Sequence, residues 1–458
     1  MPEKKTESEG KAREWSHRPH PGRTAMQQAT NGKEMVTLEN IMEGRNVLMA
    51  CQRVVSNNGA PGVDGMRAEE LTSHLMAHWK ALQESVLDGS YRPEAVRRVE
   101  IPKPQGGVRK LGIPTVMDRM LQQAIGQELD REYDPTFSEK SFGFRKGRSA
   151  HQALSLATDY LNFGLDYIVE IDLEKFFDRV SHDKMMTLLS KRIEDKRVLR
   201  LIRRYLESGA LENGVVVRND EGTPQGGPLS PILSNIMLDE LDKELEKRGH
   251  RFVRYADDIC IFTSSQRGAE RVLESITLWL EAELKLKVNG EKSGIRRPSK
   301  GNLLGFSFWH GKGGEVRPRV SGKSYDRLKD KIRKLTSRSW SVSMAQRLEK
   351  LTQTTRGWVN YFAKADANQR LKALDEWTRM RLRMCIWKQW KRVGTRMKNL
   401  QKLGATKQKA YEWANSRKGY CRIAHSPILH TTITNERLEQ KGYSPMLAMY
   451  TRIRGKSR

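Results

Sequence analysis

The sequence contains few cysteines and no long apolar segment. The four cysteines in 458 residues stand singly, which argues against a disulfide framework and against a cysteine-based zinc site. No apolar run is long enough to cross a bilayer, and the N-terminus shows no signal peptide. We therefore expect a cytoplasmic protein that makes no membrane contact and keeps its thiols reduced.

Acidic residues are scarce toward the C-terminus. Residues 321–458 hold 33 Lys and Arg against nine Asp and Glu, so they carry +24 of the net charge of +28, whereas residues 34–320 carry +1. Such a basic segment predicts a polyanionic partner. We expect three parts: a flexible basic tail at 1–35 with almost nothing apolar to bury, a near-neutral part at 36–320 that carries the chemistry, and a basic part at 321–458 that binds.

Two adjacent carboxylates, Asp257 and Asp258, are predicted at the tip of a β-hairpin. The β-branched and aromatic residues of 252–253 and 259–262 on either side are typical of strands. An isolated Asp-Asp pair in a turn is usually only exposed. Here the apolar flanks predict a buried hairpin, in which adjacent carboxylates repel each other unless a cation binds. Hard oxygen ligands of this kind suit Mg²⁺, so we expect a magnesium site.

A third carboxylate, Asp172, is predicted to join this pair. Residues 167–171 have the pattern of a buried strand, and Asp172 follows at its end. Taken alone, such an Asp is usually a helix cap. A strand end beside a hairpin tip is, however, a rigid way to bring three carboxylates together. The three would then form a two-metal site for phosphoryl transfer.

Three further segments carry groups suited to nucleotides and nucleic acid. Lys103 and Arg109 flank the turn of a second predicted hairpin, where two cations could close over a triphosphate, although basic hairpins are more often only solvated. The Gly-rich loop 141–149 mixes aromatics with cations, which suits base stacking beside phosphate contacts. The loop 222–231 exposes backbone and the amide of Gln225 where a substrate would pass.

Two amphipathic helices are predicted within the basic part. The first begins at Ser343 with a capping-box pattern, and the second runs from about Ala367 to Trp390 with Asp366 as its cap. Its tryptophans are expected in the core. Its cations are predicted to contact a polyanion, because a net charge of +24 exceeds what solubility requires. These cations are Arg379, Arg381, Arg383 and Lys388.

Taken in order, these segments resemble the reverse transcriptases encoded by bacterial group II introns, from about Leu38 onward. The resemblance implies an α+β fold, that of a right-hand polymerase, with fingers and palm at 36–320. An α-helical thumb, also called domain X or the maturase domain, would follow at 321–458. It would bind RNA, which makes RNA the polyanion expected at Arg379, Arg381, Arg383 and Lys388. The segment Gly357 to Phe362 matches a familiar part of that thumb.

The resemblance also implies roles for individual residues. The three carboxylates named above would be catalytic and would bind two Mg²⁺ ions. Lys103 and Arg109 would contact the incoming triphosphate, and Gln225 would lie beside the nascent base pair. An aromatic residue five positions after the first Asp, here Phe177, would press on the sugar and exclude a 2′-hydroxyl, with Phe176 as the alternative.

The function implied is that of an RNA-directed DNA polymerase that copies RNA into cDNA and, as a maturase, assists splicing and mobility of its group II intron RNA. Its expected partners are that intron RNA, an RNA template with a DNA or RNA primer, dNTPs and target DNA. Because paired Cys and His residues of an HNH endonuclease are missing, we expect the branch often called class C. Two alternatives stay open: a splicing-only RNA chaperone, which the intact carboxylates disfavour, and a domesticated relative used in repair or phage defence.

Overall fold

The computed structural model describes residues 36–102, 106–212, 215–217, 222, 226–311 and 313–456. The predicted tail at 1–35 lies outside these ranges. Within them, no helix combines the length and the apolar character that a membrane crossing needs. The described chain opens with the helices α1 (Leu38–Ile41), α2 (Gly44–Asn57) and α3 (Leu71–Leu87).

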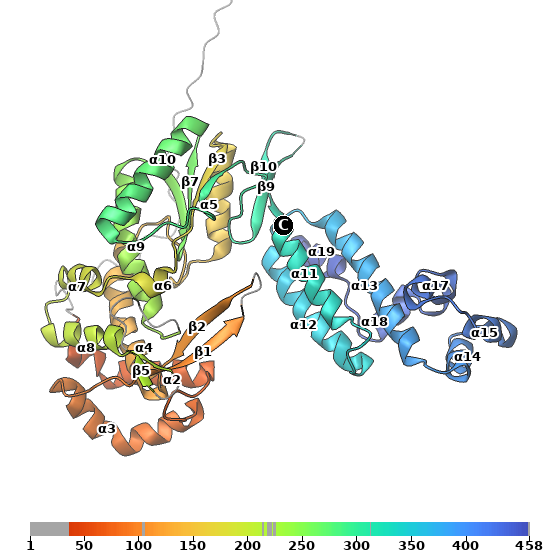
Figure 1. Ribbon diagram of the computed structural model, residues 1–458, viewed down its shortest axis with the longest axis horizontal. Coiled ribbons are helices and arrows are strands. Elements are labelled where there is room, and N and C mark those ends of the chain that lie inside the picture. Colours follow the sequence, from red (N-terminus) through yellow and green to blue (C-terminus); the bar gives the residue numbers. More distant parts are fainter. Residues whose placement is uncertain are drawn as a thin grey trace, which may run out of the picture. The chain divides into compact units, whose positions relative to one another are not determined.

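A first sheet contains the predicted basic hairpin. Its strands lie in the order β2-β1-β4-β5, with β1 and β2 antiparallel and β4 parallel to β1. The base of the β1–β2 hairpin is buried and its far end is exposed, because only the base packs against neighbouring elements. Figure 1 shows the two strands as a twisted ribbon. The strands are β1 (Val96–Pro102), β2 (Val108–Ile113), β4 (Ala210–Glu212) and β5 (Val215–Val217).

A second sheet holds the strands that were predicted around the carboxylates. Its order is β6-β7-β3-β8, and every neighbouring pair is antiparallel. The predicted hairpin of 252–262 is confirmed as β6 and β7, and the buried strand of 167–171 is confirmed as β3. The strands are β3 (Tyr167–Ile171), β6 (Arg251–Tyr255), β7 (Asp258–Thr263) and β8 (Gly294–Arg296).

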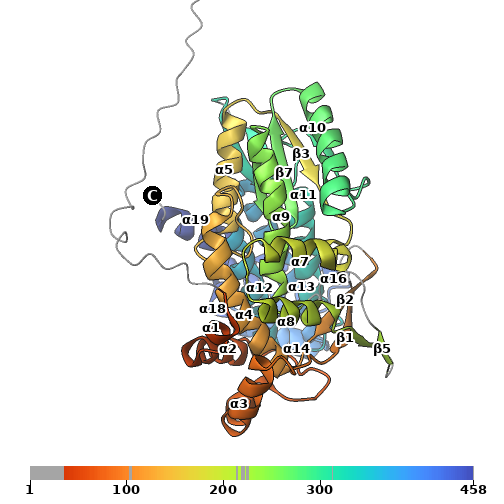
Figure 2. The same ribbon diagram turned by 90° about the vertical axis from the view of Figure 1, so that its left-hand side faces the viewer.

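Both faces of this second sheet are covered. Side chains alternate between the two faces of a strand, and the strands of this sheet carry apolar residues on both. One face, with Val169 and Ile261, belongs to the same core cluster as residues of α9 (Ser230–Lys247) and α10 (Gln266–Trp279). The opposite face packs against α5 (Ala150–Asn162). Figure 2 shows α5 and α10 on opposite sides of the strands. Because every strand is held on two faces, the strand ends that carry the carboxylates are rigidly placed.

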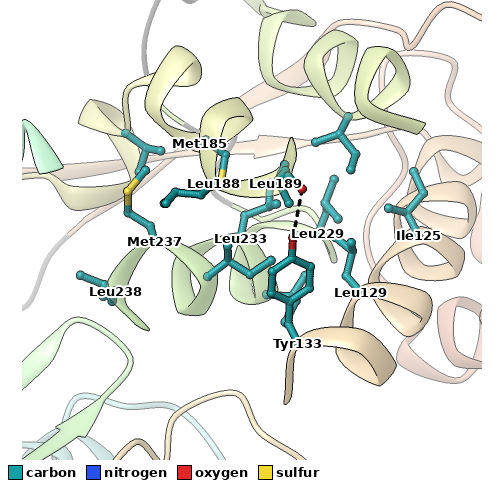
Figure 3. Close-up of a cluster of buried hydrophobic side chains, with 14 of the residues drawn as sticks. Ile125, Leu129, Tyr133, Met185, Leu188, Leu189, Leu229, Leu233, Met237 and Leu238 are labelled. Carbon is teal, nitrogen blue, oxygen red and sulfur yellow. Dashed lines mark hydrogen bonds between the residues drawn. The ribbon is translucent and has the colours of Figure 1, made fainter. Parts of the chain in front are cut away.

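The larger core lies where three helices meet: α4 (Val116–Tyr133), α7 (His182–Ser190) and α9. Figure 3 shows their apolar side chains interdigitating, with the Tyr133 hydroxyl donating to the Leu189 carbonyl at 3.3 Å. Thr115 caps the start of α4, because its side chain accepts a hydrogen bond from the Asp118 amide. The short α6 (Phe176–Arg179) and α8 (Lys196–Glu207) complete this part of the chain.

The C-terminal part is helical. The hairpin of β9 (Phe306–His310) and β10 (Val316–Val320) leads into α11 (Gly322–Leu335), α12 (Met344–Phe362) and α13 (Asn368–Gln389). The capping box at Ser343 is confirmed, and Trp387 is fully buried as expected. Smaller helices follow, which are α14 (Val393–Lys402), α15 (Lys407–Ala414), α16 (Tyr420–Ala424), α17 (Pro427–Thr432), α18 (Asn435–Gln440) and α19 (Met446–Lys456).

The predicted cap of α13 is wrong. The N-cap position belongs to Ala367, which makes no side-chain cap. The Asp366 amide instead donates to the Pro318 carbonyl at 2.9 Å. The backbone of Asp366 also forms an isolated parallel β-bridge with Arg319 of β10. The residue thus joins the helical part to the β9–β10 hairpin. A local capping pattern could not reveal this, because the hydrogen-bond partner lies 48 positions earlier in the chain.

Candidate active site

The turn between β6 and β7 is tight and conformationally strained. Tyr255 pairs with Asp258, so that only Ala256 and Asp257 form the turn, and Ala256 has a left-handed φ of 57°. The backbone of Gly143 presses against it, because a Cβ on Gly143 would lie 2.2 Å from the Ala256 nitrogen. Left-handed backbone is costly for a residue other than glycine, and it persists only where the surroundings hold it.

The strand pairing brings the three carboxylates to one edge of the second sheet. Ile171 lies opposite Ile259 in the antiparallel pair of β3 and β7, so Asp172 follows opposite Asp258. The backbone beyond β3 is also fixed: the Asn289 amide donates to the Asp172 carbonyl at 2.8 Å, and the Asp172 amide donates to the Ser293 hydroxyl at 3.0 Å. This register places Asp172 at the same edge of the sheet as Asp257 and Asp258, and their joint role as metal ligands stays a prediction.

Concentrated negative charge perturbs these groups. Loss of surrounding water together with the charges of Asp257 and Asp172 raises the pKa of Asp258 to about 6. Burial and Asp172 also raise the pKa of Asp257, and the guanidinium groups of Arg109 and Arg254 oppose that rise. The ammonium of Lys292 lies 3.5 Å from an Asp172 carboxylate oxygen and supplies partial compensation. Like charges raise one another's pKa values in this way when no cation separates them.

The donor set fits a hard divalent cation. All three side chains offer carboxylate oxygens, and the negative charge of Asp172 raises the pKa of both Asp257 and Asp258. Within the described ranges, no three carboxylate, imidazole or thiol groups are already gathered tightly enough to hold a metal by themselves. Mg²⁺ suits such a site, because it commonly takes one or two protein carboxylates and completes its shell with water and substrate phosphates.

The predicted nucleotide contacts are only partly visible. Lys103 and Gln225 lie outside the described residues. Arg109 is exposed on β2, opposite Ile101 of β1, and its charge acts on Asp257. The charge of the hairpin therefore reaches the carboxylates through Arg109, and the contact of Arg109 with a triphosphate stays a prediction.

The structure distinguishes the two candidate sugar-gate aromatics by burial. Phe176 belongs to the core and is 2% exposed, whereas Phe177 is partly exposed and packs edge-on against it. An aromatic that contacts substrate must reach the surface, so this difference favours Phe177. The assignment stays a prediction.

Sequence reasoning missed a contact behind Phe177. Gly222 has φ of 89°, and a Cβ there would lie 2.8 Å from the Phe177 carbonyl oxygen. The imidazole nitrogen Nε2 of buried His182 lies 2.7 Å from the Gly222 carbonyl oxygen. The two residues therefore back the turn that presents Phe177. No local signal could have found this pair, since the residues are 40 positions apart.

The predicted RNA contacts on α13 need correction. Arg383 is 3% exposed, and its guanidinium donates to the Ile433 carbonyl and to Asn435, so it holds the helical part together and is not available to RNA. Arg381 is half-buried and donates to Thr336 and to the Arg333 carbonyl. Arg379 and Lys388 are also half-buried, and Lys388 lies over the Tyr420 ring.

A more exposed row of cations lies on α11, and sequence reasoning did not single it out. Lys323, Arg327, Lys331 and Lys334 are all exposed. Their spacing of four, four and three places them on one face of the helix. We call this group the α11 stripe. Its helical periodicity was available in the sequence, but only the structure shows that the opposite face, with Leu328 and Ile332, is buried.

Comparisons with known proteins match both parts of the chain. A model described as reverse transcriptase (RNA-dependent DNA polymerase) matches residues 101–308, and a model of the group II intron maturase-specific domain matches residues 325–404. Protein YkfC of Escherichia coli K12 is 31% identical over 339 residues, which cover 65% of this chain and 89% of YkfC. The chain belongs to the group II intron reverse transcriptase family. It is an RNA-directed DNA polymerase with a maturase domain, in a right-hand fold with a helical C-terminal part.

Other relatives differ in length or in detail. The group II intron-encoded protein LtrA of Lactococcus lactis subsp. cremoris is 29% identical over 362 residues, so that the reverse transcriptase described here spans about 60% of LtrA. A structure of telomerase from Candida albicans, with a fragment of telomeric RNA, matches 72% of this chain and 65% of its own at 14% identity and a TM-score of 0.40. Reverse transcriptase domains use divalent metal ions, in agreement with the carboxylate cluster.

Proposed function

We propose that this reverse transcriptase copies RNA into cDNA by two-metal phosphoryl transfer at Asp172, Asp257 and Asp258. The observation that carries the proposal is the register of β3 and β7, which puts Asp172 opposite the Asp257–Asp258 turn. Fingers and palm would occupy 36–320, and the thumb or maturase domain 321–458. The substrates would be an RNA template with a DNA or RNA primer, and dNTPs.

The three carboxylates would hold two Mg²⁺ ions. When bound, these ions activate the primer 3′-hydroxyl and stabilise the leaving pyrophosphate. The protein's own groups would do the rest of the work. Arg109 would bind the triphosphate from the hairpin side, as its exposed position and its effect on Asp257 support. Phe177 would press on the sugar and reject a 2′-hydroxyl, with Gly222 backing its turn.

The maturase role would reside in the basic helical part. It would bind the group II intron RNA during splicing and bring it to target DNA during mobility. The α11 stripe supports this role better than the arginines of α13, because its four cations are exposed whereas Arg383 is buried. Structured RNA is recognised largely through phosphates and shape, for which a basic helix on a packed support is suited.

Asp257→Ala tests the catalytic assignment. The substitution removes an oxygen ligand, so primer extension on an RNA template should fall below detection while RNA affinity stays within about twofold, since the phosphate contacts lie elsewhere. Glu274→Ala is the matched control, because it removes an exposed carboxylate from α10, a helix that packs against β3 and β7. Clear primer extension by purified Asp257→Ala protein would refute the two-metal proposal.

A further inference from the structure

Beneath the catalytic turn lies an ion pair that is closed off from water. Arg254 of β6 and Asp242 of α9 both have side chains that are 0% exposed. Nε of Arg254 donates to both Asp242 carboxylate oxygens at 2.8 and 2.9 Å, and Nη2 donates to Oδ2 at 2.6 Å. This is the forked geometry in which a guanidinium binds a carboxylate most strongly.

The remaining arm of the same guanidinium reaches the turn itself. Nη1 of Arg254 donates to the Ala256 carbonyl at 3.1 Å and to Oδ1 of Asn235 at 3.0 Å. The Asn235 amide in turn donates to the Gly143 carbonyl at 2.9 Å. Gly143 is the residue whose backbone touches Ala256 from outside. One guanidinium therefore links α9, the loop at Gly143 and the turn before Asp257.

These contacts account for a conformation that Ala256 would not keep by itself. Its left-handed φ aims the Ala256 carbonyl inward, where the Arg254 guanidinium donates to it. The peptide that contains this carbonyl also contains the Asp257 nitrogen, so fixing the carbonyl fixes the direction in which the chain enters Asp257. A buried ion pair is seldom the most stabilising way to fill a core, since apolar residues of similar volume do as well or better. The presence of the Arg254–Asp242 ion pair beneath a strained turn is explained if the pair fixes the geometry of that turn.

We propose that Arg254 is a positioning residue, held by Asp242 and Asn235, which fixes the Ala256 carbonyl and thereby aims Asp257 and Asp258 at Asp172 before metal and nucleotide bind. The inference rests on the proposed catalytic function of those carboxylates. Arg254 touches neither substrate nor metal in this account. Arg254 acts on Asp257 only through the peptide group that joins Ala256 to Asp257.

The test replaces the ion pair by apolar groups of similar size in the double variant Arg254→Met, Asp242→Leu. Hydrogen–deuterium exchange of the backbone amides of 255–258 is read in the full chain without metal, and the Mg²⁺ concentration for half-maximal primer extension is read separately. We expect exchange at the turn to rise at least tenfold. The Mg²⁺ requirement should rise by about 10–100-fold, the range seen when groups that orient metal ligands are removed.

Controls separate positioning from general loosening. Arg347→Met removes another buried arginine, which donates to the Leu335 and Trp340 carbonyls, and should leave exchange at 255–258 unchanged. If the double variant does not fold, Asn235→Ala decides, since it keeps the ion pair and should still raise both readouts. A folded double variant with unchanged exchange and unchanged Mg²⁺ requirement would overturn the inference. Activity of Asp257→Ala would instead overturn the catalytic assignment, whatever the exchange shows.

Discussion

Removing a carboxylate of the proposed catalytic site should make the metal-free protein more stable. Asp258 lies beside Asp257 and Asp172, and loss of surrounding water together with their negative charge raises its pKa to about 6. Ionised Asp258 therefore costs the folded state free energy that the unfolded chain does not bear. Asp258→Asn keeps the size of the side chain and removes its charge, so it should abolish DNA synthesis and raise the free energy of unfolding without metal.

The size of the effect follows from the pKa. The difference between about 6 and the ordinary value of 3.8 corresponds to about 3 kcal/mol at 1.36 kcal/mol per tenfold change in the proton equilibrium. Although neighbouring atoms displace part of the water around Asp258, much of the residue stays in contact with solvent. Solvent therefore screens much of the repulsion, and we expect about 1 kcal/mol. For a chain of 458 residues, that raises the midpoint of thermal unfolding by about 1 °C.

The pH dependence has a definite sign. A carboxyl whose folded pKa lies above its unfolded pKa takes up its proton first in the folded state, so its contribution to stability falls as pH rises. The penalty is absent below about pH 4 and fully present above about pH 6, the window that the raised pKa of Asp258 defines. The advantage of Asp258→Asn should therefore be seen at pH 7–8 and should disappear near pH 4.

Scanning calorimetry of both proteins in chelator, at pH 4.5 and pH 7.5, measures this advantage. Adding Mg²⁺ should stabilise the wild type more than Asp258→Asn, because a ligand stabilises the state that binds it. Glu274→Gln on the exposed face of α10 controls for loss of one charge. The reasoning would be refuted if Asp258→Asn were less stable than the wild type at pH 7.5 without metal.

Three further predictions concern selection and binding. Phe177→Ala should raise the ratio of ribonucleotide to deoxynucleotide kcat/KM while deoxynucleotide addition falls only modestly; relaxation by Phe176→Ala alone would show that the assignment is off by one residue. Arg383→Ala should destabilise the protein by about 2–3 kcal/mol in denaturant unfolding, since it strands the buried Ile433 carbonyl, whereas Arg379→Ala should not. Replacing the four cations of the α11 stripe by Glu should weaken the salt dependence of RNA binding. The slope of log affinity against log salt concentration should fall by roughly 0.7 for each phosphate that the protein no longer neutralises. An unchanged slope in a folded variant would indicate that RNA binds at α13 instead.

The elements around the site could be predicted because their signals are local. Alternating and β-branched residues identify β3, β6 and β7, and each carboxylate sits at a strand end that the same pattern delimits. The register of β6 and β7 follows from the two-residue turn between them, which pairs Tyr255 with Asp258. The convergence of Asp172 with Asp257 and Asp258 is thus encoded in short stretches of sequence, although their pKa values are not.

The supports of the site could not be predicted, because each depends on partners brought together by the fold. The sequence shows a cation at Arg254 and an acid at Asp242, but no local pattern indicates that the two side chains form a fully buried ion pair. The net charge of the segment 321–458 could not show which cations of α13 are buried, for the same reason. A helix surrounded by other elements buries even a cation, as Arg383 shows, whereas α11 keeps one face open to solvent.

The separation of charge along the chain explains how an acidic site can work on a polyanion. Three carboxylates at one sheet edge repel phosphate as well as one another, so template and primer cannot be held by the site itself. Exposed cations elsewhere must supply that attraction, and the segment 321–458 with its net charge of +24 can do so. Salt weakens binding through phosphates. The orientation of the carboxylates is set by the buried hydrogen bonds of Arg254, which dissolved ions cannot reach. Raised salt should therefore release RNA well before it disturbs the geometry of the turn.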